Sequence, residues 1–216
     1  KKIILEGGDV HSYDKLILTT GAHVRKLNVP GADLSGVFYL RSIDDVERIK
    51  GFIGAGMKAV VIGGGYIGLE TSAVLNKLGM DVTVLESMGR VLQRVTTREI
   101  SAFYTRIHTE EGISIITDVT VNSIKDEKYV KNVVCTDGRE FNADLVIIGI
   151  GVLPTTQLAE SAGLVVDNGI RVDEFAQTSD PDIFAAGDCT NHYNSIYGRY
   201  IRLESVQNAV DQAKTA

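Results

Sequence analysis

The stretch Lys58–Glu86, KAVVIGGGYIGLETSAVLNKLGMDVTVLE, places a glycine-rich turn between two short apolar runs. The first run, residues 59–62, has the length and composition of a buried parallel strand. Glycines at G-x-G-x-x-G spacing follow, and apolar residues then recur at helical spacing until Gly79. The second run, residues 82–85, ends in the acidic residue Glu86. This order of strand, glycine turn, helix, strand and acid predicts a dinucleotide-binding fingerprint.

Each glycine of the fingerprint has a predicted task. Gly63 allows a tight turn, Gly65 lets the backbone approach a pyrophosphate, and Gly68 lets the helix pack close to the strand. The helix N-terminus offers N–H groups and a partial positive charge to the phosphates. Glu86 is placed to accept hydrogen bonds from the adenosine ribose, and its charge would repel a 2′-phosphate. We therefore expect NAD rather than NADP, a preference that Arg90 would weaken if it reached the phosphate.

The composition argues against several classes of protein. The chain has 216 residues, of which 44% are hydrophobic, enough for one or two globular units. A net charge of -6 and a pI of about 5.2 disfavour nucleic acid as a partner. No apolar run is long enough to predict a membrane-spanning helix. The two cysteines and four histidines lack metal-ligand spacing, so we expect no metal, and we expect a reducing, cytoplasmic compartment.

Two more apolar runs lead into glycine turns, as the fingerprint strand does. Residues 15–18 precede Thr19–Ala22, and residues 144–148 precede Gly149–Gly151. Residues 189–204, with their three tyrosines, read as a loop. Hydrophobic periodicity and N-cap residues predict the remaining elements, namely helices at 43–53 (cap Ser42), 97–110 (cap Thr96), 158–162 and 206–216 (cap Ser205), and a hairpin of 119–125 with 129–136.

Taken together, these segments resemble the flavoprotein reductases that have two dinucleotide-binding domains, the FAD-dependent pyridine nucleotide-disulfide oxidoreductases. Within that superfamily the chain is similar to the NADH-dependent ferredoxin and rubredoxin reductases of oxygenase and P450 systems. The resemblance covers nearly the whole chain and rests on these stretches: Tyr13–Gly21, Gly63–Glu70, Arg90–Tyr104, Thr178–Asp188 and Arg202–Ala209.

The resemblance implies an α/β fold with two Rossmann-like domains, each a parallel sheet with helices and a small antiparallel meander. Residues 33–152 would form the NAD-binding domain, and residues 1–32 with 153–216 an incomplete FAD-binding domain. The family's first G-x-G-x-x-G, which holds FAD, does not occur before Gly63, and its C-terminal domain does not follow. We therefore expect the chain to be the middle of a longer enzyme, inactive on its own.

The resemblance also implies the residues of the site. Glu70 is the catalytic candidate, because it would pair with a lysine outside this chain. Tyr66 and Ile67 would border the nicotinamide, and Gly149 and Gly151 would let NAD pass close to the backbone. Asp188 would bind the FAD ribityl chain, and the helix that begins at Val206 would face the pyrimidine end of the flavin. The residues implied in FAD binding are Thr20, Gly21, Ala22, Arg25, Gly187, Asp188, Val206 and Gln207.

The activity implied is transfer of hydride from NADH to FAD, followed by single electrons to a small iron–sulfur protein, a ferredoxin or rubredoxin. Three alternatives stay open at this point. The first is an NADH-sensing flavoprotein of the apoptosis-inducing-factor kind. The second is a disulfide reductase whose cysteines lie outside this chain, since the predicted NAD-binding domain has no C-x-x-C. The third is a module that binds NAD alone.

Overall fold

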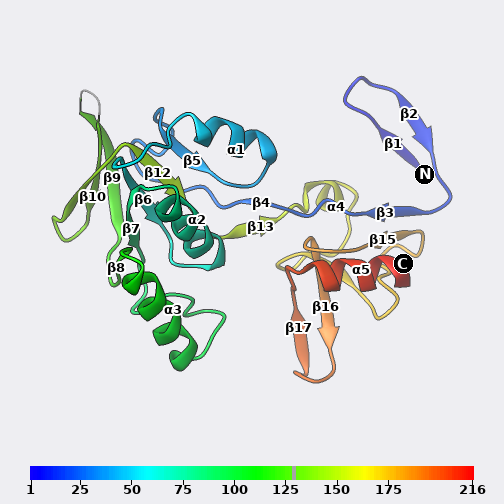
Figure 1. Ribbon diagram of the computed structural model, residues 1–216. Coiled ribbons are helices and arrows are strands. Elements are labelled where there is room, and N and C mark those ends of the chain that lie inside the picture. Colours follow the sequence, from blue (N-terminus) through cyan, green and yellow to red (C-terminus); the bar gives the residue numbers. More distant parts are fainter. Residues whose placement is uncertain (128–129) are drawn as a thin grey trace. The chain divides into compact units, whose positions relative to one another are not determined.

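The computed structural model describes residues 1–127 and 130–216, and the chain divides into two units (Figure 1). Val24–Gly151 forms one, here called the central unit. Lys1–His23 and Val152–Ala216 together form the other, here called the terminal unit. The predicted domain limits fall after residues 32 and 152, whereas the two units meet after His23 and after Gly151. The assignment of one cofactor to each domain stays a proposal.

A five-stranded parallel sheet forms the core of the central unit, in the order β5-β12-β6-β7-β8. Strand β6 contains the first apolar run of the fingerprint, residues 59–62, as predicted. It lies in the middle of the sheet, between β12 and β7. The confirmed α/β class therefore rests on a sheet in which helices join β5 to β6, β6 to β7 and β7 to β8, while an antiparallel meander joins β8 to β12. The bounds of the strands are β5 Val37–Tyr39, β6 Lys58–Ile62, β7 Asp81–Leu85, β8 Ser114–Ile116 and β12 Leu145–Ile148.

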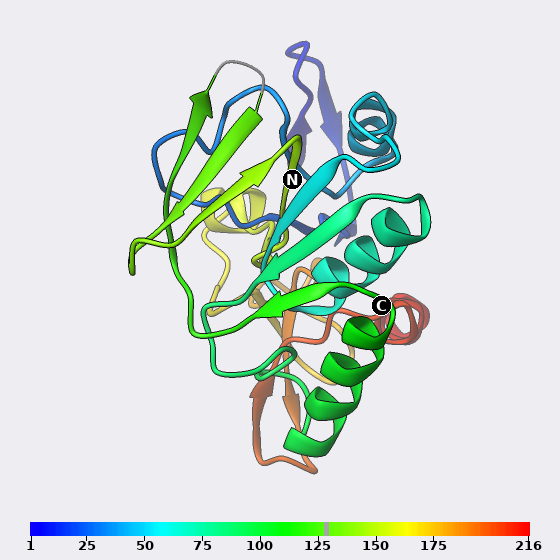
Figure 2. The ribbon, with the colours of Figure 1, turned by 60° about the vertical axis from the view of Figure 1, so that its left-hand side comes forward.

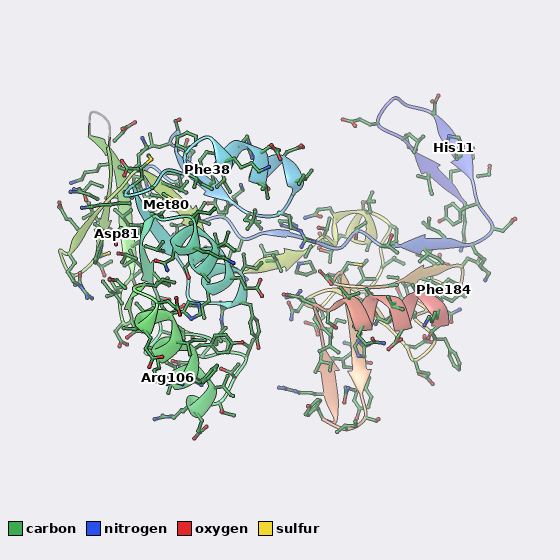
Figure 3. The ribbon with its side chains drawn as sticks, in the orientation of Figure 1. His11, Phe38, Met80, Asp81, Arg106 and Phe184 are labelled. Atoms are coloured by element: carbon green, nitrogen blue, oxygen red, sulfur yellow. The ribbon has the colours of Figure 1, made fainter. Side chains whose placement is uncertain are left out.

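Both faces of this sheet are covered, which explains why its strands are apolar without alternation. Val61 and Ile147 point to the face covered by helices, where they pack with Ile49 of α1 and Leu75 of α2. Phe38 and Met80 belong to this same core (Figure 3). The opposite face packs against an antiparallel meander in the order β11-β10-β9. Figure 2 shows the helices α2 and α3 and the meander on opposite sides of the sheet.

The meander fits the predicted hairpin and the strand after it. Its strands are β9 Val121–Glu127, β10 Val130–Cys135 and β11 Glu140–Ala143. The turn expected at 126–128 lies partly outside the described residues. Val121 and Ile124 of β9 and Val133 of β10 bury their side chains against the sheet.

Three helices belong to the central unit: α1 Ile43–Lys50, α2 Tyr66–Lys77 and α3 Arg98–Glu110. The capping box predicted at Ser42 is present, because Ser42 accepts from the N–H of Asp45 while the Asp45 carboxylate accepts from the Ser42 N–H. The cap predicted for α3 was wrong by one residue. Thr97, and not Thr96, caps the helix by accepting from Ile100 N–H. The Thr96 hydroxyl instead donates to the carbonyl of Leu92.

The terminal unit is built from short strands around a smaller core that includes Leu18, Ile170, Ile183 and Cys189. Strands β3 and β15 form a parallel pair, and β14, β16 and β17 form a three-stranded sheet. Strand β4 Ala22–Val24 begins in this unit and ends at the first residue of the central unit. The other elements are β1 Lys2–Ile4, β2 Val10–Ser12, β3 Leu16–Leu18, β13 Val152–Pro154, α4 Gln157–Ser161, β14 Ile170–Val172, β15 Ile183–Ala185, β16 Thr190–Asn194, β17 Arg199–Ile201 and α5 Val206–Thr215.

The loop predicted at 189–204 was wrong, because most of it forms the antiparallel hairpin β16–β17. Tyr193 lies opposite Tyr200 in this hairpin, with the two rings edge to face at 5.5 Å. The Arg171 guanidinium of the neighbouring strand β14 stacks 3.6 Å from the centre of the Tyr200 ring. Such cross-strand aromatic and cation–π contacts stabilise a hairpin whose sequence alone reads as irregular.

Candidate functional site

The glycine turn follows the carboxyl end of β6 and leads into α2. Gly65 is the N-cap residue of α2, with φ −81° and ψ −175°, and no side chain caps the helix. By contrast, α1, α3 and α5 are capped by the side chains of Ser42, Thr97 and Ser205. The first N–H groups of a helix have no partner within it. The α2 N-terminus therefore offers its N–H groups and the positive end of its dipole to an anion.

Two fingerprint glycines are required by close backbone approaches. A Cβ at Gly68 would overlap the carbonyl of Gly63, and one at Gly63 would overlap the carbonyl of Gly149. Gly63 also has a φ of +110°, which side-chain-bearing residues rarely adopt. Gly65 differs, because a Cβ there would meet no atom of the described residues within 4 Å. Packing among those residues therefore does not require a glycine at 65, and its predicted role at a pyrophosphate stays a prediction.

The end of β12 lies against the same turn. The N–H of Gly149 donates to the carbonyl of Ile62 at 2.8 Å, and a Cβ on Gly149 would lie 3.5 Å from the Gly68 nitrogen. Gly151 has a φ of +103° and open space at its Cβ position. The structure thus brings Gly149 together with the fingerprint, as the carboxyl ends of adjacent parallel strands require.

Glu86, at the carboxyl end of β7, is half-buried and holds the turn in shape. Its Oε2 accepts from the N–H of Gly64 at 2.7 Å, and its Oε1 accepts from the N–H of Met88 at 2.8 Å and from the Ser87 hydroxyl at 3.3 Å. From the sequence, Glu86 was expected to face the ribose, and this backbone role was not predicted. A carboxylate has about four lone-pair sites, so these three bonds leave about one site for a ribose hydroxyl.

The loop after Glu86 packs back on the glycine turn. Leu92 N–H donates to the Gly64 carbonyl at 2.9 Å, and the side chain of Leu92 is buried with Leu69 of α2. Arg90 organises this loop, and its guanidinium donates to four oxygens: the carbonyls of Gln93, Thr96 and Thr97 and the hydroxyl of Ser101. The idea that Arg90 weakens the preference for NAD finds no support in this geometry.

The first turns of α2 expose the residues expected near the nicotinamide. Tyr66 is 49% exposed and Ile67 40% exposed, and Glu70 follows one turn later, also exposed. Within the described part of the chain, no hydrogen bond or ion pair is recorded for the Glu70 carboxylate. All three side chains are therefore accessible on the helix that begins at the glycine turn. Their roles stay a prediction.

Several residues expected near FAD lie together in the terminal unit. Strands β3 and β15 run parallel, and the turns Thr20–Ala22 and Gly187–Asp188 follow their carboxyl ends. The Thr20 hydroxyl donates to the Thr155 carbonyl at 2.6 Å, while Thr155 N–H donates to the carbonyl of Gly21 at 2.9 Å. Gly21 and Gly187 both have positive φ, at 64° and 86°. Two tight turns thus lie side by side at one end of a parallel pair.

Gln212 of helix α5 hydrogen-bonds to the Gly187 turn, a contact that was not predicted from the sequence. Gln212 Oε1 accepts from Gly187 N–H at 2.9 Å and from the Thr190 hydroxyl at 2.8 Å. Its amide nitrogen lies 3.3 Å from Nδ1 of His192. Because the amide can only donate there, Nδ1 must be unprotonated, which agrees with burial lowering the pKa of His192. A polar residue on the inner face of an amphipathic helix was the signal for this role.

At the N-terminus of α5, Val206 is 82% exposed and Gln207 bonds along the helix to Asp211. Both side chains are exposed at the start of a helix whose later residues Ala209 and Gln212 lie against Gly187. Arg25 is the remaining residue expected near FAD. It belongs to the central unit, where its N–H donates to the Gly151 carbonyl at 2.9 Å.

Cys135 and Cys189 are free and buried, and they belong to different units. Among residues 1–127 and 130–216, no three His, Cys, Asp or Glu side chains are arranged to hold a metal ion. In the same residues, no helix combines the length and apolarity needed to cross a bilayer.

The fold and the glycine turn define a class of protein. The chain belongs to the pyridine nucleotide-disulphide oxidoreductase family, whose model matches residues 1–213.

Within this family, particular relatives share about two-fifths of the sequence. The chain is 44% identical over 220 residues to putidaredoxin reductase of Pseudomonas putida, an alignment covering 99% of this chain and 52% of that protein. It is 39% identical over 215 residues to a rubredoxin-NAD(+) reductase of the same species, covering 99% and 56%. Among solved structures, the putidaredoxin reductase in its covalent complex with putidaredoxin superposes with a TM-score of 0.94 at 43% identity, covering 99% and 53%. The chain thus spans about half the length of the curated relatives it matches.

Proposed function

We propose that this chain is the nucleotide-binding part of an NADH-dependent, FAD-containing reductase that passes electrons to a small iron–sulfur protein. The observation that carries the proposal is the uncapped N-terminus of α2. Gly65 leaves open space in front of the first N–H groups of α2. In α1, α3 and α5 a serine or threonine hydroxyl occupies the corresponding place. A pyrophosphate is the ligand that such a turn accepts in this family of folds.

The proposed NADH preference rests on Glu86. Its carboxylate lies at the carboxyl end of β7, beside the glycine turn, and is fixed there by the N–H groups of Gly64 and Met88. A fixed carboxylate accepts hydrogen bonds from ribose hydroxyls, whereas a 2′-phosphate would meet its charge. The cation nearest in sequence, Arg90, donates its N–H groups to oxygens of the protein.

The residues of the terminal unit fit a flavin cofactor in their chemistry. Asp188 directly follows Gly187, a turn residue with positive φ whose N–H donates to Gln212 of α5, and the first residue of that helix, Val206, is exposed. When bound, FAD would supply the two-electron acceptor for hydride and the one-electron donor for the partner. The task of the terminal unit would then be to hold the flavin, with Asp188 on the ribityl hydroxyls and the α5 dipole favouring negative charge.

The proposed partner is a ferredoxin or a rubredoxin, on the strength of the relatives named above. Cys135 and Cys189 are buried in different units and do not form a redox pair, so a disulfide reductase would need cysteines outside this chain. We further propose a cytoplasmic location, in keeping with two free cysteines. Cell fractionation with an antibody against the protein tests that location.

Stopped-flow spectroscopy of the whole protein tests the proposal. Flavin absorbance near 450 nm is followed after mixing with NADH or NADPH, and then after mixing the reduced protein with a ferredoxin or a rubredoxin. The proposal predicts bleaching by NADH at least about tenfold faster than by NADPH, then one-electron reduction of the iron–sulfur protein. Equal rates with both nucleotides would remove the role of Glu86. Bleaching without transfer to either iron–sulfur protein would favour the NADH-sensing alternative.

A further inference from the structure

The segment that follows Glu86 has a second carboxylate beside it, that of Asp118. The chain at 116–119 runs next to the chain at 86–88, since Glu86 N–H donates to Ile116 O at 2.8 Å and Val119 N–H to Glu86 O at 3.1 Å. Asp118 N–H donates to the Met88 carbonyl at 3.2 Å. Its side chain lies over Gly89, with Oδ1 at 3.4 Å from the position that a Gly89 Cβ would take.

The backbone of Asp118 holds its carboxylate there in an unusual conformation. Its φ is +55°, in the left-handed region that residues other than glycine adopt sparingly. The side chain is exposed, and the hydrogen bond recorded for the carboxylate in the described residues comes from the Thr117 hydroxyl, to Oδ2 at 3.4 Å. A charged side chain is thus presented to solvent by strained backbone, the kind of position that is enriched at functional sites.

We propose that Asp118 is a specificity-determining residue that excludes 2′-phosphorylated nucleotides together with Glu86. This inference rests on the proposed function, in which Glu86 faces the 2′-hydroxyl of the adenosine ribose. A phosphate on that hydroxyl would extend beyond Glu86, towards the segment 87–89 that Asp118 overlies. It carries a charge of about −1.5 to −2, so a second carboxylate adds to the repulsion.

If both carboxylates repel the 2′-phosphate, both must be neutralised for the protein to accept NADPH fully. Neutralising Glu86 alone leaves the Asp118 charge in place, so it opens the site to NADPH only in part. Neutralising both removes both repulsions. Asn is suited to position 118, because it adopts left-handed backbone readily and keeps the shape of Asp.

The test is calorimetric titration of the protein with 5′-AMP and with 2′,5′-ADP, the adenosine ends of NAD and NADP. Four variants are compared with the wild type: Asp118→Asn, Glu86→Gln, the double variant, and Asp81→Asn as the matched control. Asp81 starts the same strand that ends before Glu86 (Figure 3). It is exposed, and at about 3.3 Å per residue it is about 16 Å from Glu86 along β7.

Asp118→Asn is expected to raise the affinity for 2′,5′-ADP relative to 5′-AMP about fivefold, and the double variant more than either single variant. The gain should shrink in 0.5 M salt, as screening of an exposed charge requires and a structural effect would not. Asp81→Asn should leave the ratio unchanged. A ratio for Asp118→Asn equal to that of Asp81→Asn would overturn the inference while leaving the NAD site standing. Failure of the wild type to bind 5′-AMP at all would overturn both.

Discussion

Replacing Gly65 by Ser should stabilise the protein slightly while removing most of its affinity for NADH. The two effects have one cause, which is competition for the N–H groups at the start of α2. The dihedrals of Gly65, φ −81° and ψ −175°, nearly match those of Thr97, φ −73° and ψ +170°, which caps α3. A Ser hydroxyl at 65 can therefore cap α2 without rearrangement, and the Ser Cβ would meet no atom of the described residues within 4 Å.

The magnitudes follow from these two facts. Ser is a better N-cap than Gly by a few tenths of a kcal/mol, so the melting temperature should rise by about 1 °C. On the ligand side, one N–H bond to a phosphate oxygen is lost, and such a charge-assisted bond contributes about 2 kcal/mol, or roughly 30-fold in affinity. The hydroxyl also fills space that the pyrophosphate needs, so about 30-fold is a lower limit on the loss of NADH affinity.

The assays are thermal unfolding and NADH titration by fluorescence, with Gly51→Ser as the matched control. Gly51 has a φ of −67°, and a Cβ there makes an ordinary contact at 3.7 Å with the Arg48 carbonyl. That substitution should leave NADH binding unchanged. If Gly65→Ser folded normally and bound NADH as tightly as the wild type, the assignment of the pyrophosphate to this helix end would be refuted.

Three further changes test other parts of the structure. Gly68→Ala should destabilise the protein by about 3 kcal/mol in urea unfolding, because its Cβ would overlap the Gly63 carbonyl; a loss below about 0.5 kcal/mol would contradict this packing. The pKa of Asp45 is lowered to about 2, chiefly by the Ser42 N–H, so its contribution to stability is complete above about pH 4 and is lost as the pH falls towards 2. Asp45→Asn should cost about 1 kcal/mol at pH 7 and flatten the unfolding curve over that acid range; an unchanged acid dependence would argue against the capping box. Glu70→Gln should leave stability within about 0.5 kcal/mol, since its side chain is exposed, yet slow flavin reduction by NADH about tenfold in the whole protein; normal reduction would remove Glu70 from the site.

The local patterns of the sequence predicted the central unit well. Residues 59–62 and 82–85 are strands of the core, the helix between them begins at Tyr66, and the cap Ser42 is in place. In the terminal unit, the predicted cap Ser205 is also present. These features depend on residues close in sequence, namely glycines, hydroxyl caps and uninterrupted apolar runs. Such local patterns can therefore be recognised in the sequence without knowledge of the fold.

What the sequence did not predict depends on segments that meet only in the fold. The bond from Gly64 to Glu86 joins residues 22 positions apart, and that from Gly187 to Gln212 joins residues 25 apart. The hairpin β16–β17 was missed because its tyrosines are stabilised partly by Arg171 on another strand. The position of Asp118 beside Met88 follows from the pairing of β7 with β8, which no local pattern specifies.

The central claim is that NADH binds at the N-terminus of α2. It is tested most directly by following the backbone amides of the ¹⁵N-labelled protein during titration with NADH. The account predicts saturable shifts at Gly65, Tyr66 and Ile67, with much weaker shifts under the same concentration of NADPH. Saturable NADH binding that leaves these three amides unmoved and shifts those of another surface would contradict it.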